Sequence, residues 1–149
     1  FLNSDNSPEY IDDYTVPVCC DENDILMTRT GNTGMVVTGA EGVFHNNFFK
    51  INFDRNKLYS KYFVTYLRSH TCQKTILDKA GTSTIPDLNH HDFYSIKIAL
   101  PSFEEQRDIA DVLSDMDSEL DGLQQRLTKT QKIKQGMMQE LLTGKTRLV

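Results

Sequence analysis

The clearest pattern in this chain is a heptad repeat that occupies its last third, residues 101–149. Apolar or seam-compatible residues recur there at alternating steps of four and three, the period of two helices packed along a seam. The positions that follow this pattern are Ile109, Leu113, Met116, Leu120, Leu123, Leu127, Thr130, Lys134, Met137 and Leu141. The repeat predicts one long coiled-coil-type helix, whose apolar stripe needs a partner helix to cover it.

Both ends of this helix have sequence signals. Ser102 stands where an N-cap is expected, and Glu105, three residues later, completes a capping box. Gly144 is the expected left-handed terminator, and Lys145 and Arg147 suit the negative end of the helix dipole. About 41 residues at ~1.5 Å per residue predict a rod of roughly 60 Å.

Charges divide along the same helix into an acidic first half and a basic second half. Arg107 is the only basic residue in the first half, and Glu140 is the only acidic residue in the second half. The acids are Glu104, Glu105, Asp108, Asp111, Asp115, Asp117, Glu119 and Asp121, and the bases are Arg126, Lys129, Lys132, Lys134, Lys145 and Arg147. Such a helix complements a copy of itself, or a similar helix, in the antiparallel direction. We therefore expect antiparallel self-association.

Before the helix, the pattern changes to short apolar runs separated by turn residues. Strands are predicted over 24–29, 35–38, 43–45, 48–53 and 94–100, and helices over 57–80 and 87–93. Turns rich in glycine separate the first strands, and Gly81 is expected to end the first helix. The fold class is therefore α+β: a small mixed domain over residues 1–100, followed by the long helix over 101–149.

Composition limits the classes of protein. An apolar content of 38% is enough for one small core, and no apolar run approaches the ~20 residues that a membrane span needs. The cysteines, Cys19, Cys20 and Cys72, are odd in number and two are adjacent, which favours reduced thiols in a cytoplasmic protein. For His90 and His91, a polar loop or helix start is preferred over metal ligation. The start at Phe1 suggests a fragment that begins inside a domain.

Charge alone does not indicate a nucleic-acid partner, because the net charge is −5. The distribution changes this picture. Residues 25–102 carry nine Lys or Arg against five Asp or Glu, a balance of +4. A DNA-binding surface in this segment is therefore permitted.

Catalytic motifs are largely missing. Gly144-Lys145-Thr146 imitates the end of a phosphate loop, but Gln139 stands at the position of the earlier glycine and the run follows a helix. Pro86-Asp87 lacks the Glu-x-Lys that a nuclease motif requires, and no Asn-Pro-Pro-aromatic run of an amino-methyltransferase is present. We expect that the chain is not an enzyme by itself and holds no metal.

Two polar loops flanked by glycine remain as candidate binding elements. Residues 29–34 offer a guanidinium, hydroxyls and an amide between paired strands, groups that bind base edges. Residues 81–84 offer backbone N–H and hydroxyl donors suited to phosphate oxygens. The structural alternative is that Gly31 and Gly34 only form a hairpin turn and that residues 82–84 only cap the next helix.

Several segments together resemble the specificity subunit of type I restriction–modification systems. Their order and spacing agree from about Ile25 to the end of the chain. The segments are Asp24-Ile25-Leu26-Met27-Thr28-Arg29-Thr30-Gly31, Asn47-Phe48-Phe49-Lys50-Ile51, Ala80-Gly81-Thr82-Ser83-Thr84-Ile85-Pro86-Asp87-Leu88-Asn89, Ile98-Ala99-Leu100-Pro101, Glu104-Glu105-Gln106-Arg107-Asp108-Ile109-Ala110, and Lys134-Gln135-Gly136-Met137-Met138-Gln139-Glu140-Leu141-Leu142-Thr143-Gly144-Lys145.

The resemblance implies a non-catalytic role in a larger complex. Such subunits carry two target recognition domains, each reading one half of a split double-stranded DNA site, separated by two antiparallel spacer helices. Methylation subunits with S-adenosylmethionine dock on this frame, and a restriction subunit with ATP and Mg²⁺ joins them, so no cofactor is expected in this chain. One recognition domain without its opening strands implies the C-terminal part of a full subunit, or a half-length subunit that forms a homodimer.

Transferred to this sequence, the resemblance implies DNA contacts in both loops. The candidates are Arg29, Thr30, Asn32, Thr33, Thr82, Ser83 and Thr84, with Asn89 and His90 beside them and Lys50, Arg55 and Lys79 as phosphate contacts. The helix-pairing residues are Ile109, Leu113, Met116, Leu120, Leu123, Leu127, Met137 and Leu141. The alternative is a coiled-coil scaffold with a protein-binding head. An independent nuclease or methyltransferase is disfavoured by the missing motifs.

Overall fold

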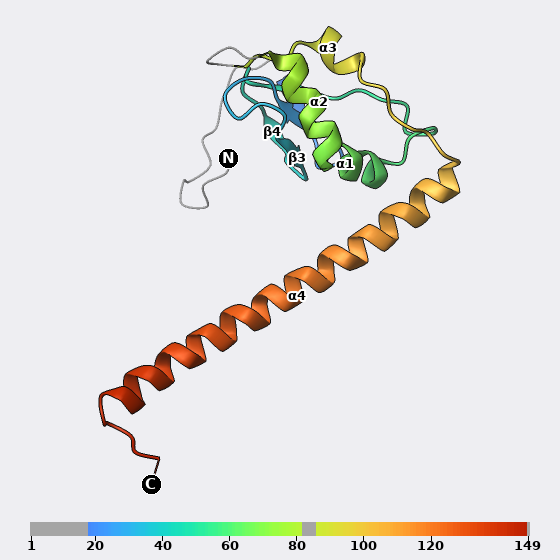
Figure 1. Cartoon of the computed structure of the whole chain (residues 1–149). Helices are drawn as coiled ribbons and strands as arrows, with labels where there is room; N and C mark the ends of the chain where they lie inside the picture. Colours follow the sequence, from blue (N-terminus) through green and yellow to red (C-terminus); the bar gives the residue numbers. More distant parts are fainter. Residues whose placement is uncertain (1–17, 82–85, 149) are drawn as a thin grey trace. The chain divides into compact units, whose positions relative to one another are not determined.

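The computed structural model describes residues 18–81 and 86–148, and the chain divides into two units, Phe1–Gln106 and Arg107–Val149 (Figure 1). Small antiparallel sheets and short helices form the first unit, and one long helix forms the second. This architecture confirms the predicted α+β class. The division falls inside the first turns of the long helix, whereas the sequence placed it between residues 100 and 101.

A three-stranded antiparallel sheet forms the centre of the first unit, with strand order β3-β2-β5. Its strands are β2 (Ile25–Thr28), β3 (Val36–Thr38) and β5 (Phe48–Lys50). Met27 of β2 pairs with Val36 on one side and with Phe49 on the other. The predicted hairpin of the first two strands is therefore confirmed.

A second, two-stranded sheet pairs β1 (Cys19–Cys20) with β4 (Gly42–Val43). The sequence predicted a strand over 43–45, so β4 begins earlier and ends sooner. Phe44 still donates its N–H to the Val18 carbonyl at 2.9 Å, but the chain then turns toward β5. The strand at 19–20 was missed, because two residues are too few for an alternating pattern.

The helix predicted over 57–80 is wrong in one respect, because two helices stand there, α1 (Ser60–Arg68) and α2 (His70–Ala80). Ser69 separates them in an extended conformation, with ψ at 146°. Its hydroxyl accepts the Cys72 N–H at 3.3 Å and so caps α2. Serine competes with the helix in this way because its short side chain bonds the nearby backbone. Gly81, at φ 87°, ends α2 as predicted.

The short helix α3 (His90–Tyr94) begins three residues later than the sequence indicated for 87–93. Asn89 accounts for this shift, because its side chain accepts the Asp92 N–H at 2.9 Å and defines the N-cap. Asp87 is instead part of an isolated antiparallel bridge with Thr30.

The strand predicted over residues 94–100 is wrong, since this segment forms no ladder with any described strand. Tyrosine hydroxyls of α1 replace the ladder. Tyr66 donates to the Lys97 carbonyl at 2.9 Å, and Tyr62 donates to the Ala99 carbonyl at 3.0 Å. Ile96 and Ile98 are partly buried against the core. The alternating apolar residues of this segment therefore reflect its packing on the core, without a neighbouring strand.

The hydrophobic core lies between the helices and one face of the three-stranded sheet. Side chains of β2 alternate between its two faces, so Ile25 and Met27 enter this core while Leu26 faces the opposite side. Its other buried members are Val36, Phe49, Ile51, Leu58, Phe63, Leu67, Cys72, Ile76, Ala80, Leu88 and Phe93. This packing fixes the β2–β3 turn and the segment before α3 within one unit.

The long helix α4 runs from Phe103 to Leu142. The Ser102 hydroxyl accepts the Glu105 N–H at 3.2 Å, which confirms the predicted N-cap. At the other end Gly144 has φ 72°, and the Thr146 N–H bonds to the Glu140 carbonyl at 3.1 Å, which confirms the glycine terminator. Among the described residues, no helix combines the length and apolar character that crossing a lipid bilayer requires.

Candidate nucleic-acid interface

The β2–β3 loop, residues 29–34, is organised from the inside by Thr28. This side chain is buried, and its hydroxyl donates to the Asn32 carbonyl and accepts the Met35 N–H at 2.9 Å. The Gly34 N–H bonds to the Thr28 carbonyl at 2.9 Å. These bonds give the loop one closed backbone conformation instead of an open turn.

Gly34 seats the loop on α2. Its φ is 89°, and a Cβ added there would lie 2.9 Å from the Ile76 Cγ2 atom and 3.1 Å from the Gln73 Oε1 atom. The Gln73 side chain also donates to the Gly34 carbonyl at 2.9 Å. Glycine is therefore required at this position both by the left-handed backbone and by the close approach of α2.

Arg29 does not stand free at this surface, because it forms a two-pronged ion pair with Asp87. The Arg29 Nε atom lies 3.0 Å from Oδ1, and the Nη2 atom lies 2.9 Å from Oδ2. The hydrogen bond with Asp87 raises the pKa of the Arg29 guanidinium, and the same bond lowers the pKa of the Asp87 carboxyl. Both side chains remain in contact with solvent, 40% and 48% exposed.

The two threonines of the loop also have internal partners. Thr33 is buried, 8% exposed, and its hydroxyl lies 2.9 Å from the Pro86 carbonyl and 3.2 Å from the Arg29 carbonyl. Thr30 donates to the Asn47 Oδ1 atom at 3.0 Å. The structure therefore brings three of the predicted contact residues, Arg29, Thr30 and Thr33, into the packing of the loop itself.

Asn32 differs from its neighbours. Its backbone carbonyl is held by Thr28, but its side chain is exposed and makes no hydrogen bond within the described residues. Gly31 beside it is exposed too, at φ 78°, with open space where a Cβ would stand. Asn32 thus presents an uncommitted amide, one acceptor and two donors, at the tip of an ordered loop.

Three candidates of the second predicted loop, Thr82, Ser83 and Thr84, lie outside the described residues. Of the nearby candidates, Asn89 caps α3 with its side chain. The His90 ring packs edge-on against the Phe49 ring, with 5.0 Å between centroids.

Two of the three basic residues proposed as phosphate contacts are paired within the chain. Lys50 Nζ lies 3.1 Å from the Asp24 carboxylate and 3.0 Å from the Cys19 carbonyl. Arg55 Nη2 lies 3.4 Å from the same carboxylate and 3.0 Å from the Asn23 carbonyl. These contacts neutralise part of the positive balance that the sequence showed for residues 25–102.

Sequence reasoning missed the residues that organise the loop from elsewhere in the chain, namely Asp87 and Asn47. Asp87 is separated from Arg29 by 58 positions, and no local pattern reports a contact over that distance. Asn47 offered a weak signal, since it belongs to an Asn-Asn turn ahead of β5.

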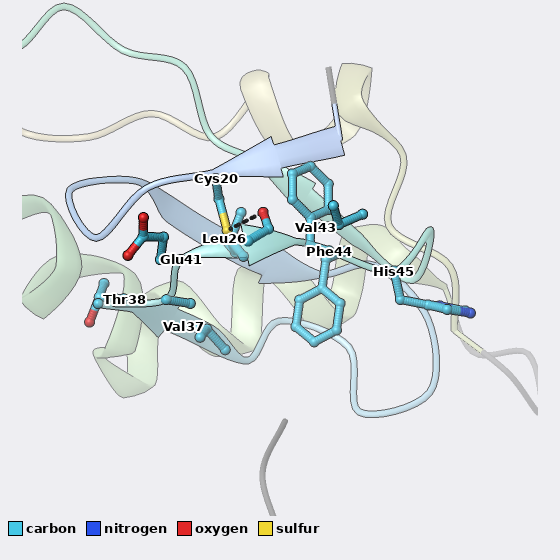
Figure 2. A pocket seen from close by; sticks show the side chains of 12 residues that line it. Cys20, Leu26, Val37, Thr38, Glu41, Val43, Phe44 and His45 are labelled. Atoms are coloured by element: carbon cyan, nitrogen blue, oxygen red, sulfur yellow. Dashed lines mark hydrogen bonds between the residues drawn. The ribbon is translucent and has the colours of Figure 1, made fainter. Parts of the chain in front are cut away.

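A cavity of about 470 Å³ lies on the face of the three-stranded sheet to which Leu26 points, and residues from both sheets line it (Figure 2). Figure 2 shows mainly apolar groups around it, including Leu26, Val43 and Phe44. Burial raises the pKa of the Cys20 thiol, whose sulfur donates to the Gly42 carbonyl at 3.4 Å. Within residues 18–81 and 86–148, no group of three side chains could hold a metal ion.

The predicted pairing residues form an exposed apolar stripe on α4. Leu120 is 62% exposed, Leu113, Met116, Leu123, Leu127 and Met137 are exposed, and Ile109 and Leu141 are half-buried. Toward the C-terminal end Ile133 and Met138 are exposed next to the stripe, which widens it. An apolar face of this length is typical of a helix that packs against another.

Comparison with known proteins identifies the family. The family model described as type I restriction modification DNA specificity domain matches residues 2–135, so the chain belongs to this family. The resemblance inferred from the sequence motifs is thereby confirmed.

Individual relatives agree with this assignment. The chain is 32% identical over 128 residues to the type I restriction enzyme MjaVIII specificity subunit of Methanocaldococcus jannaschii, covering 85% of this chain and 29% of that protein. It is 31% identical over 99 residues to the putative MjaX specificity subunit of the same organism, covering 65% of this chain and 23% of that protein. The chain thus spans less than a third of the length of these relatives.

A solved structure shares the fold. The crystal structure of the S subunit of a type I restriction–modification system from M. genitalium matches with a TM-score of 0.59 at 22% identity, covering 80% of this chain and 32% of that one.

Proposed function

We propose that this chain is the DNA-recognition part of a type I restriction–modification specificity subunit and reads one half of a split double-stranded site. The observation that carries the proposal is the family match, which covers residues 2–135 and includes the β2–β3 loop. The chain is not the catalyst, since the methylation and cleavage chemistry resides on other subunits. Such a role places the protein in the cytoplasm, where cellular DNA lies.

The β2–β3 loop contributes sequence information through its tip. An asparagine amide presented by a rigid loop can accept from adenine N6 and donate to adenine N7 in the major groove. Asn32 has this geometry available, because its side chain is exposed and uncommitted among the described residues. Thr82, Ser83 and Thr84 remain the proposed phosphate or base contacts of the second loop.

The partners follow from the same assignment. The chain itself binds no cofactor. Methylation subunits supply S-adenosylmethionine, and a restriction subunit uses ATP and Mg²⁺. The helix α4 serves as the spacer on which these subunits dock.

The stripe on α4 also needs a partner helix, and its sequence favours an antiparallel copy or a similar helix. In one antiparallel register the seam residues of the two copies face each other in pairs. Leu120 then faces Leu123 of the second copy, and Met116 faces Leu127. In this register Glu119 lies beside Arg126 of the second copy, twice by symmetry. In this register the acidic half of each helix lies opposite the basic half of the other.

Sedimentation of the full chain tests the pairing. We expect a dimer at tens of micromolar. Leu120→Asp should convert it to a monomer, because a carboxylate would face the apolar seam. Gln125→Asp is the matched control, since Gln125 is exposed and lies away from the seam. A wild-type monomer under these conditions overturns the pairing.

DNA binding is tested by selection from a pool of random duplexes, using the chain assembled with its methylation subunits. We expect enrichment of a defined half-site, and the logarithm of the binding constant should fall linearly as the logarithm of salt concentration rises. The comparisons do not favour the scaffold alternative, which predicts neither result. Absence of both enrichment and salt-dependent binding would overturn the proposal.

A further inference from the structure

Arg29 is the obvious base-reading residue of the β2–β3 loop, but the Nε and Nη2 donors on one edge of its guanidinium are already bonded to Asp87. A guanine contact uses two parallel N–H donors of one guanidinium, aimed at O6 and N7. Asp87 takes this kind of two-pronged contact from Nε and Nη2, at 3.0 and 2.9 Å. Reading a guanine through that edge would therefore require Arg29 to break a charge-assisted pair first.

The backbone around the pair holds both partners in register. Thr30 and Asp87 form an antiparallel bridge, and the Leu88 N–H bonds to the Arg29 carbonyl at 2.9 Å. The Thr33 hydroxyl adds a bond to the Pro86 carbonyl at 2.9 Å. An isolated exposed ion pair contributes little, because its side chains must be ordered first. Here the main chain aligns the two residues, so the pair joins two segments that are far apart in the sequence.

The loop tip shows the opposite arrangement. The Asn32 main chain is fixed by Thr28, whereas its amide points into solvent without a partner among the described residues. A ligand group that is rigid in its backbone and free in its side chain loses little conformational entropy on binding. Asn32 therefore satisfies both requirements of a base contact, whereas Arg29 has a fixed backbone but a side chain that is bonded to Asp87.

We propose that Arg29 is a positioning residue clamped by Asp87, and that Asn32 is the specificity-determining residue of this loop. The proposal rests on the DNA-reading function proposed above. Arg29 acts through the segment 86–88, which holds the loop against the fold so that the Asn32 amide meets a base edge. The base pair that Asn32 favours is one with adenine in the major groove.

The test measures binding of the assembled protein to duplexes from a random pool, for Arg29→Ala, Asp87→Ala, their double variant, the exchange Arg29→Asp with Asp87→Arg, and Asn32→Ala. If the pair positions the loop, Arg29→Ala and Asp87→Ala weaken binding to the same extent and keep the preferred bases. The double variant is then no weaker than either single one, and the exchange restores affinity. Lys61→Ala is the control for the loss of one positive charge, since Lys61 is an exposed residue of α1.

Other roles for Arg29 give different results. If Arg29 contacts a phosphate, Asp87→Ala frees the guanidinium and strengthens binding, which is opposite in sign. If Arg29 reads a base, only Arg29→Ala erases discrimination at one base pair. Either result overturns the positioning role. For Asn32→Ala we expect a loss of about 5- to 150-fold on the preferred sequence and relaxed preference at one position. Unchanged preference would overturn the assignment of Asn32.

Amide hydrogen exchange of the free protein separates this proposal from the function on which it rests. Exchange at the Leu88 and Gly34 amides, both hydrogen-bonded to the β2–β3 segment, should accelerate equally in Arg29→Ala and Asp87→Ala. No acceleration in either variant overturns the clamp, whatever the DNA results. If the wild type neither enriches a DNA sequence nor binds DNA in a salt-dependent way, the proposed function fails and the assignment of Asn32 fails with it, while exchange still decides the clamp.

Discussion

Gln106 offers the sharpest test of how the first unit is held together. Its side chain is fully buried, at 0% exposure, and both its amide oxygen and its amide nitrogen are hydrogen-bonded. The Oε1 atom accepts the Tyr59 N–H at 2.8 Å, and Nε2 donates to the Lys57 carbonyl at 2.9 Å and the Pro101 carbonyl at 3.0 Å. One side chain therefore satisfies three backbone groups, two just before α1 and one just before α4.

The cost of Gln106→Ala follows from these three bonds. A net ~1 kcal/mol for each gives about 3 kcal/mol, and buried backbone groups left without a partner raise the loss toward ~5 kcal/mol. A domain of this kind has only ~5–15 kcal/mol of unfolding free energy in total. We therefore expect Gln106→Ala to reduce the unfolding free energy of the first unit by about 3–5 kcal/mol.

Gln106→Glu adds a second, pH-dependent readout. The introduced carboxyl keeps the acceptor for Tyr59 but points charge at the carbonyls of Lys57 and Pro101, so burial raises its pKa above that of the unfolded chain. Because the unfolded state then loses its proton first, stability falls as pH rises above ~4.3, by up to ~1.4 kcal/mol per pH unit until the folded pKa is reached. The exposed Gln124→Glu is the matched control, with an effect within ~0.5 kcal/mol.

Urea unfolding followed by tyrosine emission measures these effects in the first unit alone. All six tyrosines precede Gln106 and the chain has no tryptophan, so α4 contributes no signal. A Gln106→Ala variant within ~0.5 kcal/mol of the wild type would show that the three bonds are dispensable. Equal pH dependence in Gln106→Glu and Gln124→Glu would refute the burial argument.

Two further predictions concern the β2–β3 loop. Gly31→Ala should cost about 1–2 kcal/mol in urea unfolding for its left-handed backbone, and Gly34→Ala should cost more because a Cβ would lie 2.9 Å from the Ile76 Cγ2 atom; equal losses would contradict this contact. Since the hydrogen bond with Arg29 lowers the pKa of Asp87, the stabilisation by their pair is complete above the unfolded pKa of ~3.9 and disappears as pH falls through the lower folded value. Exchange protection of the Leu88 amide, compared at about pH 5 and about pH 2, should show this loss, and Asp87→Asn should abolish the pH dependence.

Local signals in the sequence predicted the elements whose causes are local. The hairpin of β2 and β3 and both ends of α4 follow from turn glycines and a capping serine that act within a few residues. The heptad period likewise predicted that α4 is one continuous helix. In each case the sequence signal lies within a few residues of the feature that it predicts.

The errors have non-local causes or involve competing short-range bonds. Alternation at Ile96 and Ile98 looked like a strand, yet a strand needs a neighbour, and Tyr62 and Tyr66 took the carbonyls instead. Ser69 interrupted a helical pattern because its hydroxyl caps the following helix.

The sequence predicted the β2–β3 loop, but it did not show which of the loop's side chains have partners inside the fold. Arg29 appeared free because its partner is 58 positions away, and Thr33 appeared available although its hydroxyl faces inward. Asn32, named among several candidates, is distinguished from them only by the structure. The sequence shows which chemical groups a loop carries. Only the fold shows which of these groups are already hydrogen-bonded within the protein.

The free side chain of Asn32 has a consequence for how such a protein evolves. A side chain that makes no hydrogen bond within the described residues can be exchanged with a change in folding free energy of only about 0.5 kcal/mol, so selection can act on it independently. A library randomised at Asn32 should yield folded proteins at nearly uniform levels, whereas one randomised at Gln106 should not, because that side chain holds three backbone groups. The first unit thus separates an exchangeable position from the side chains that support the fold, and under the proposed function new target preferences would arise by single substitutions.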